Sequence, residues 1–277
     1  MVNAGMPRKL FVTIVALLNV APLFAQFDFP AMGGRSAALG GVSVMLDDAM
    51  STMSGNAMLA SAEKASVGLG VRQDFLAQGM GYAMLGGVVP TGFGAASASV
   101  VHFGSSEYNE QNISLAYAIP IGKAVALSAV LHYLHSGTAD PYYDPINRVT
   151  FSLSLGFCPS DELMIGFKAF NPVAVKADMP EEQRVPTLFC LGLSYRLVDG
   201  LLSVAEVEKR LDQQATLRFG LEYVFKESYF LRVGVNTFPV AYSFGFGMEF
   251  GGFGADLAAQ IHNVLGLTPQ LSLNYSF

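Results

Sequence analysis

The sequence contains no tryptophan, only two cysteines and few charged residues, and these shortages exclude several classes of protein. Charged residues are 14% of the chain, against about a quarter in soluble proteins, so a fully water-facing surface could not be coated with charge. Cys158 and Cys190 form no CxxC motif, and the strand pattern described below puts them toward opposite ends, so we expect no disulfide. The net charge of −6 argues against nucleic acid as a partner.

Long hydrophobic runs are also missing beyond the first residues, so the sequence predicts no transmembrane helix. The start of the chain is different. Arg8 and Lys9 precede a mostly apolar run over 10–20, which is too short to span a bilayer, and Ala25 is a small residue suited to a cleavage site. These features predict a secretory signal peptide over residues 1–25.

Apolar and polar residues alternate from residue 65 onward, in runs of about ten residues separated by turn residues. Val149, Phe151 and Leu153, for example, alternate with Thr150 and Ser152. The predicted strands are 65–75, 79–90, 92–104, 110–119, 122–135, 147–158, 161–170, 186–197, 200–210, 213–225, 228–238, 240–250, 252–262 and 269–277. One apolar face per strand suits lipid outside a barrel, so residues 65–277 predict an all-β, transmembrane antiparallel β-barrel of about 14 strands. The alternative is a soluble β-sandwich or propeller.

The loop lengths and the last residue support the membrane barrel. The connections after even-numbered strands are tight turns, whereas the two longest, 136–146 and 171–185, follow odd-numbered strands. Outer-membrane barrels have short periplasmic turns and longer external loops. The last strand ends on an aromatic residue, Phe277, as is typical of barrels that the outer-membrane assembly machinery reads. The predicted location is therefore the outer membrane, with its lipid as a partner.

Residues 26–64 do not alternate and consist largely of small residues, which cannot bury enough surface to fold alone. The polar faces of the predicted strands carry glycines, which permit close approach of another backbone. These glycines are Gly156, Gly166, Gly192, Gly220, Gly234, Gly245, Gly247 and Gly254. We expect residues 26–64 to form an N-terminal plug in the periplasmic half of the barrel; the alternative is a disordered periplasmic tail.

The same segment carries a motif: residues 35–41 read RSAALGG, an acidic pair follows at 47–48, and residues 56–59 read NAML. The motif resembles the PorV/PorQ family of Bacteroidetes, and its main residues are Arg35, Gly40, Gly41, Asp47, Asp48 and Asn56. The resemblance implies a fourteen-stranded barrel with a plug, similar to long-chain fatty-acid transporters. It also implies an accessory role in type IX protein secretion, with a secretion-system or surface protein as partner.

Charged residues on the polar strand faces mix both signs. They are Lys168, Arg196, Glu206, Glu208, Arg210, Arg218, Glu222, Arg232, Glu249 and Asp256. Such a mixed interior predicts a lumen polar network of ion pairs that holds the plug. The alternative is a polar constriction that steers a solute.

The sequence predicts no catalytic centre, metal site or cofactor. The histidines lack metal-binding spacing, and Ser128 and His132 would lie about 13 Å apart along one strand. The external loop 136–146 is distinctive because Tyr142 and Tyr143 are flanked by acids, which suits a protein or glycan contact or a girdle at the loop base.

Three functions follow from these features. The main prediction is the PorV/PorQ-like accessory protein. The alternative is a fatty-acid-transporter-like channel for a small hydrophobic compound, with a lateral exit for which Gly86 and Gly87 would supply a kink. The third is a structural barrel locked by its plug.

Overall fold

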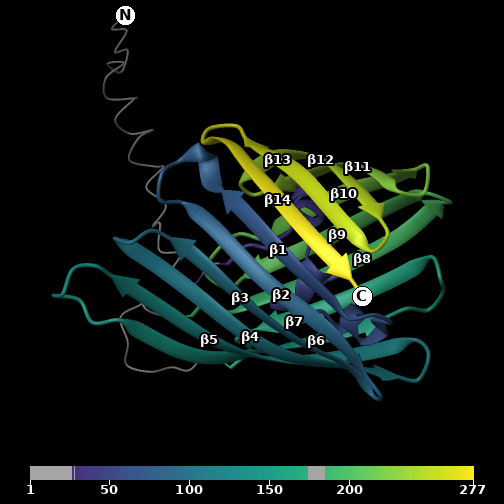
Figure 1. Ribbon diagram of the computed structural model, residues 1–277, viewed down its shortest axis with the longest axis horizontal. Coiled ribbons are helices and arrows are strands. Elements are labelled where there is room, and N and C mark those ends of the chain that lie inside the picture. The colour runs from purple at the N-terminus through teal and green to yellow at the C-terminus, as the bar shows by residue number, and fades with distance from the viewer. Residues whose placement is uncertain (1–26, 28, 174–184) are drawn as a thin grey trace, which may run out of the picture.

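Fourteen antiparallel strands close into a barrel in the computed structural model, which describes residues 27, 29–173 and 185–277 (Figure 1). The strands are β1 Ser66–Gln73, β2 Gly81–Thr91, β3 Gly94–Gly104, β4 Tyr108–Ile121, β5 Val125–Thr138, β6 Ile146–Phe157, β7 Leu163–Phe170, β8 Leu188–Val198, β9 Leu201–Arg210, β10 Thr216–Phe225, β11 Tyr229–Thr237, β12 Val240–Phe250, β13 Phe253–His262 and β14 Gly266–Ser276. Each strand pairs with its neighbours in sequence, and β1 closes the ring against β14, where Ser66 lies opposite Ser276. The predicted fold class is confirmed, and the predicted signal peptide lies outside the described residues.

The connections at the two ends of the barrel differ in length. The end that holds the C-terminal end of β14, called here the periplasmic end, has short turns such as 92–93 and 251–252. The opposite end, called here the outer end, carries the longer connections 74–80, 139–145 and 171–187. This asymmetry is the one that the sequence predicts for a membrane barrel.

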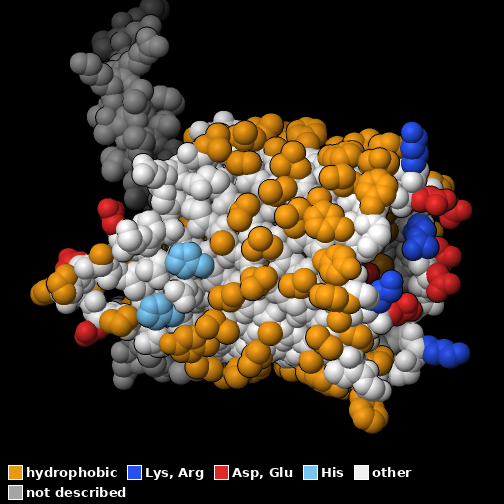
Figure 2. All heavy atoms as spheres, in the orientation of Figure 1, with side chains coloured by type: hydrophobic (Ala, Val, Ile, Leu, Met, Phe, Trp, Pro, Cys, Tyr) orange, Lys and Arg blue, Asp and Glu red, His pale blue; other side chains and the backbone are white. Residues whose placement is uncertain are grey.

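The alternation places apolar side chains outside the ring and small polar ones inside. In β6, Phe151 and Leu153 are exposed, while Ser152 and Ser154 between them are buried. Figure 2 shows apolar side chains spread over the wall between the two ends, with most of the acidic and basic groups at one end. Such a belt must be covered by a bilayer, because water would leave a large apolar surface exposed.

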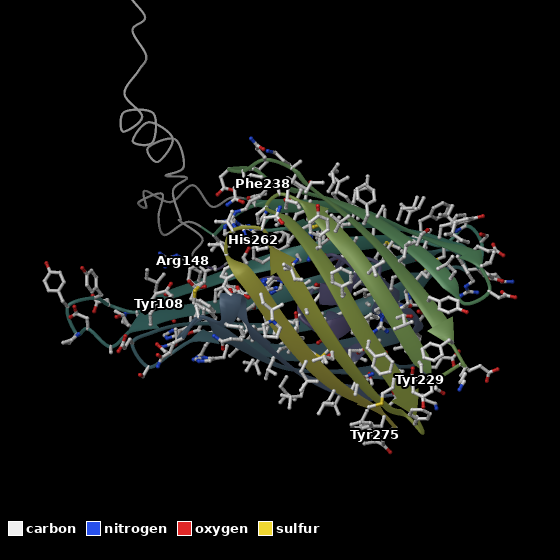
Figure 3. The ribbon with its side chains drawn as sticks, turned by 90° about the horizontal axis from the view of Figure 1, so that it is seen from above. Tyr108, Arg148, Tyr229, Phe238, His262 and Tyr275 are labelled. Carbon is white, nitrogen blue, oxygen red and sulfur yellow. The ribbon has the colours of Figure 1, made fainter. Side chains whose placement is uncertain are left out.

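Tyrosine and phenylalanine form the aromatic contacts at the rims in place of the missing tryptophan. At the periplasmic end, the ring of Tyr229 lies 5.1 Å from that of Phe225 and 5.3 Å from that of Phe250. Tyr229 and Tyr275 mark this end in Figure 3, and Tyr108 and Phe238 mark the other. These rings suit the membrane interface, since each joins an apolar body to a polar tip or edge.

The helices of the described chain are short: α2 Gly34–Ala38, η1 Ala49–Met53, η2 Ala57–Ser61 and η3 Asp74–Leu76. None of these helices is long and apolar enough to cross a membrane. The first three belong to the N-terminal segment, which lies inside the ring of strands (Figure 1).

This plug, residues 27–64, runs along the lumen from the outer end to the periplasmic end. The backbone N–H of Phe27 donates to Glu110 near the outer end of β4, at 2.9 Å. At the other end, Leu59 packs against Val88 and Ala118 near the periplasmic ends of β2 and β4. The plug therefore reaches farther than the periplasmic half in which the sequence places it.

Glycine in the wall lets the plug approach the barrel closely. A Cβ atom on Gly234 would lie 2.2 Å from the backbone nitrogen of Gly40, and one on Gly245 would lie 2.4 Å from the Cβ of Ala38. No other residue fits such gaps, since real Cβ contacts are longer. Six of the eight predicted lumen glycines face plug atoms, and Gly247 and Gly254 instead face side chains of the barrel itself.

Candidate functional site

A chain of ion pairs joins the plug to strands β10, β11 and β13. The guanidinium of Arg35 donates two hydrogen bonds to Glu222, at 2.9 and 3.0 Å. Glu222 also accepts from Arg232 at 2.6 Å, and Arg232 donates in turn to Asp256. Glu222 and Arg232 are buried, so each charge needs the partners that it has.

The acidic pair of the motif completes this chain from the plug side. Arg35 donates to Asp47 at 3.2 Å and lies 3.9 Å from Asp48. Asp48 also caps helix η1 by accepting the backbone N–H of Ser51 at 3.0 Å. The pair thus anchors Arg35 and fixes the turn that follows it.

A second network joins the plug to β9 and β10. One oxygen of Glu206 accepts the backbone N–H groups of Ser43 and Val44, at 2.7 and 2.9 Å. Arg218 donates to Glu206 and, through two nitrogens, to Glu208, with all three distances 2.8 Å. The carboxylate of Glu206 therefore holds the plug backbone and a wall cation at once.

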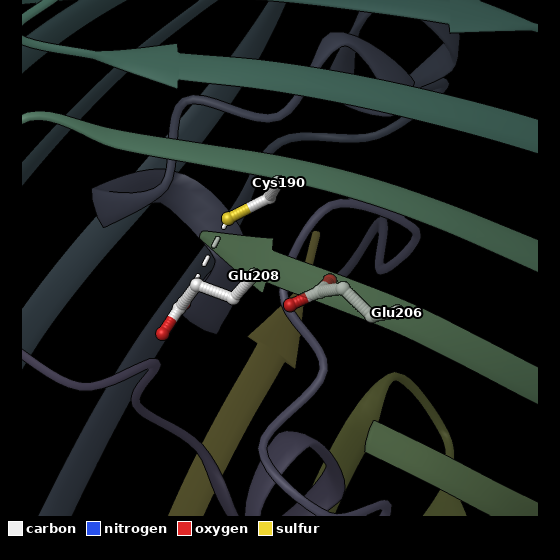
Figure 4. Close-up of side chains that lie close together, drawn as sticks. All are labelled: Cys190, Glu206 and Glu208. Atoms are coloured by element: carbon white, nitrogen blue, oxygen red, sulfur yellow. Dashed lines mark hydrogen bonds between the residues drawn. The ribbon is translucent and has the colours of Figure 1, made fainter. Parts of the chain in front are cut away.

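Cys190, Glu206 and Glu208 lie together beside this network and offer ligand atoms within 4.8 Å of one another (Figure 4). The thiol of Cys190 donates to Glu208 at 3.7 Å. Both carboxylates already bind Arg218, whose positive charge occupies the place that a metal ion would need. The donor set fits an ion-pair network and not a metal centre.

The ten charged residues predicted for the lumen fall into two groups. Eight lie inside: Lys168, Glu206, Glu208, Arg210, Arg218, Glu222, Arg232 and Asp256. Arg196 and Glu249 differ from the expectation, because both are exposed. Each lies within two residues of the periplasmic end of its strand, and at Arg196 the pairing of β8 with β9 shifts register, which breaks the alternation.

The remaining motif residues shape the plug. Gly40 and Gly41 have φ angles of +81° and +87°, which favour glycine, and the N–H of Gly41 donates to Ser36 at 2.8 Å to end helix α2. Asn56 caps η2 by accepting from Met58 at 3.1 Å and donates to the carbonyl oxygen of Leu46 at 2.5 Å. Each motif residue therefore has a structural task in the plug.

Strands β4–β6 bring together a set that the sequence did not predict. The ring of His132 bonds the hydroxyl groups of Ser114 and Ser152 through its two nitrogens, each at 2.8 Å, and these serines come from the neighbouring strands. Ser128, on the same strand, does not take part in these bonds. With both ring nitrogens bonded to hydroxyls and no carboxylate among these bonds, the set lacks the orienting acid of a hydrolase triad.

A cavity of about 60 Å³ lies next to His132, above the middle of the plug. Phe27 and Phe29 of the plug and Phe170 and Leu188 of the wall supply its apolar lining. Lys168 on β7 also lines it. Only cross-strand register places these residues together, and this explains why the sequence did not reveal the cavity.

The outer end carries a larger cleft of about 590 Å³ between loop 139–145 and the adjoining strands. Tyr142 and Tyr143, which line it with Arg148, are 86% and 62% exposed, and their rings meet edge to face at 5.3 Å. Figure 3 shows Tyr108 and Arg148 at the base of this projecting loop. Both tyrosine side chains are therefore open at the surface of the loop.

The kink expected at Gly86 and Gly87 is not present. Both residues pair in continuous register with β1 and β3, as in Gly68↔Gly86 and Gly87↔Ala98. The inner side of Gly86 is covered by Thr52 and Ala49 of the plug. A lateral exit at this position is therefore closed, since neither a bulge nor an open wall occurs there.

Solved structures match this chain over most of its length. The Ralstonia pickettii toluene transporter TbuX aligns with a TM-score of 0.67 at 13% identity, covering 91% of this chain and 100% of that chain. The P. putida toluene transporter TodX aligns with a TM-score of 0.67 at 11% identity, covering 90% and 98%, and the CymD monoaromatic hydrocarbon channel with 0.66 at 13%, covering 89% and 98%. No family model and no curated protein match the sequence. The chain has the fold of an outer-membrane β-barrel, and its apolar outer belt agrees with that membrane as its location.

Proposed function

We propose that this protein is an outer-membrane channel that admits small hydrophobic molecules at its outer end. The observation that carries the proposal is the aromatic cavity above the plug, lined by Phe27, Phe29 and Phe170. Pockets for small ligands are concave and mainly apolar, with a few polar groups that orient the ligand. The names of TbuX, TodX and CymD, which describe toluene transport and hydrocarbon channels, support the same function.

Uptake through the cavity can be tested by filling it. Leu188 lines the cavity from β8, so Leu188→Trp should block it and bring cellular uptake of labelled toluene close to that of cells without the barrel. Leu191→Trp is the matched control, because Leu191 lies on the same strand but faces outward and is 54% exposed. Equal uptake by the two variants and by cells that lack the barrel would contradict the channel.

The second candidate function is the accessory role that the PorV/PorQ resemblance implies. The observation that favours it is the projecting loop with Tyr142 and Tyr143, since exposed aromatics suit a protein partner. The motif does not discriminate between the two functions. Arg35, Asp48 and Asn56 fasten or shape the plug, and a plugged channel needs those contacts as much as an accessory barrel does.

Copurification tests this second function. The tagged barrel would be purified from detergent-solubilised outer membranes, with the variant Tyr142→Ser, Tyr143→Ser as control. A secretion component or surface protein that is retained by the native loop and lost with the double variant would support the accessory role. If neither form retains such a protein, the accessory role is rejected; if toluene uptake also fails, the structural barrel gains support.

A further inference from the structure

Lys168 differs from the paired cations of the lumen. Arg35, Arg218 and Arg232 each bind a carboxylate, whereas Lys168 forms no hydrogen bond or ion pair with any described residue. Its side chain nevertheless borders the inner cavity. A half-buried ammonium group is stabilised by a counter-ion, so an anion that enters the cavity can pair with Lys168.

The rest of the cavity suits an aromatic ring. Phe27 of the plug is 1% exposed, and Phe29 lines the same space. Phe170 forms the wall and meets His132 edge to face at a centroid distance of 5.2 Å. The benzyl groups of two plug residues already lie beside this cavity, so a ligand ring of the same size fits where one of them is displaced.

The backbone of Phe27 has an unusual conformation. Its φ angle is +61°, in the left-handed region that a bulky side chain rarely adopts, so its present conformation is unfavourable. Its backbone N–H is held by Glu110 at the outer end. The Phe27 ring is the plug group whose place we expect a ligand ring to take.

Lys168 is the only charged side chain among the described residues that line the cavity. No acidic side chain is among the described residues that line it. The polar groups beside Lys168 are neutral ones, and His132 has both ring nitrogens engaged by serine hydroxyls. A neutral hydrocarbon would leave Lys168 unpaired, whereas a carboxylate would pair with it.

We propose that this cavity binds a small aromatic carboxylate, with the ring in the place of a plug phenyl group and the carboxylate paired with Lys168. The inference rests on the proposed channel and names its substrate class.

The test is calorimetric titration of the whole detergent-purified barrel with phenylacetate, phenylacetamide and toluene. Phenylacetate should bind at least about tenfold more tightly than phenylacetamide, which has the same shape without the charge. Lys168→Met should remove that advantage, and Lys168→Arg should keep most of it. Lys123→Met is the matched control, because Lys123 is an exposed lysine in a periplasmic turn.

The outcomes are distinct. Equal affinity for phenylacetate and phenylacetamide overturns the inference on the native protein alone, so the result does not depend on a variant that folds. If toluene binds and phenylacetate binds no better, the channel proposal stands and the carboxylate is rejected. If neither binds, and cellular toluene uptake is independent of the barrel, both proposals fall.

Discussion

The two sides of the lumen wall differ in how their inward-facing charged side chains are paired. On strands β9–β13 the inward charges pair with the plug and with one another, as Glu206 and Glu222 show, and glycine lets the backbones meet. On strands β4–β8 the wall carries serine, asparagine and histidine besides Glu110, which holds the N–H of Phe27, and Lys168 forms no ion pair with a described residue. The paired charges of β9–β13 hold the plug in place, and we call this set of ion pairs the lock. A cation beside a cavity, in contrast, is available to bind a ligand.

The largest effect should come from a substitution that displaces the plug from strands β9–β13. Gly234→Val places side-chain atoms where the backbone of Gly40 now lies, so we expect the plug to leave the wall. Cys190 reports the change, because it is 1% exposed and is packed under Val44 and Met45 of the plug. In a Cys158→Ser background, maleimide labelling of Cys190 should rise by about tenfold or more, by analogy with the large protection that burial gives a thiol.

Gly92→Val is the control for this experiment, since nothing lies within 4 Å of a Cβ built at Gly92 in its periplasmic turn. It should leave the labelling unchanged. Slow labelling of Cys190 in a Gly234→Val barrel that is folded by its gel mobility would show that the glycine contact does not hold the plug.

The next largest effect should come from removing one charge of the lock. Glu222→Gln leaves the buried Arg232 and the half-buried Arg35 without their shared carboxylate, and breaking such a buried pair costs about 3–5 kcal/mol. Glu249→Gln makes the same chemical change at an exposed rim position and should cost less than about 1 kcal/mol. Urea unfolding of the two variants in the same bilayer measures the difference, and equal free energies of unfolding would refute the lock.

The barrel could be predicted from the sequence because strand alternation is a local signal. Every strand from β1 to β14 follows from a period of two, and an apolar outer face leaves only a closed sheet in lipid. The limits of β14 were less clear, because it begins at Gly266 and passes through Pro269, whereas the prediction starts at 269. Proline is unfavourable in strands because it has no backbone N–H, but that missing donor is tolerated where the strand needs no hydrogen bond at that position.

The site could be predicted only in part, because it depends on register between strands. Alternation shows that Glu206 and Lys168 point inward, but not that Glu206 meets Arg218 and the plug while Lys168 pairs with no described acid. The bonds from His132 to Ser114 and Ser152 likewise need neighbouring strands to be aligned. Single-residue slips would change every such pair, and a sequence without that alignment leaves them open.

The smallest effect tests whether the binding side extends to the outer surface. Arg148 lines the outer cleft and donates to the carbonyl oxygen of Asn147 at 2.8 Å, and it forms no ion pair with a described residue. It shares the inner face of β6 with Ser152, about 13 Å farther in, so the cleft leads toward the cavity. Arg148→Met should slow uptake of phenylacetate by about threefold at low salt, with less effect at high salt, because a half-buried cation at the mouth of a cleft attracts anions by long-range steering. Toluene uptake and the affinity of the inner cavity should not change. Lys123→Met, at the opposite end, should change neither the uptake of phenylacetate nor that of toluene.

An equal slowing of toluene uptake would mean that Arg148 acts through the shape of the cleft and not through its charge. The binding side of the lumen would then include Lys168 but would not extend to the outer surface.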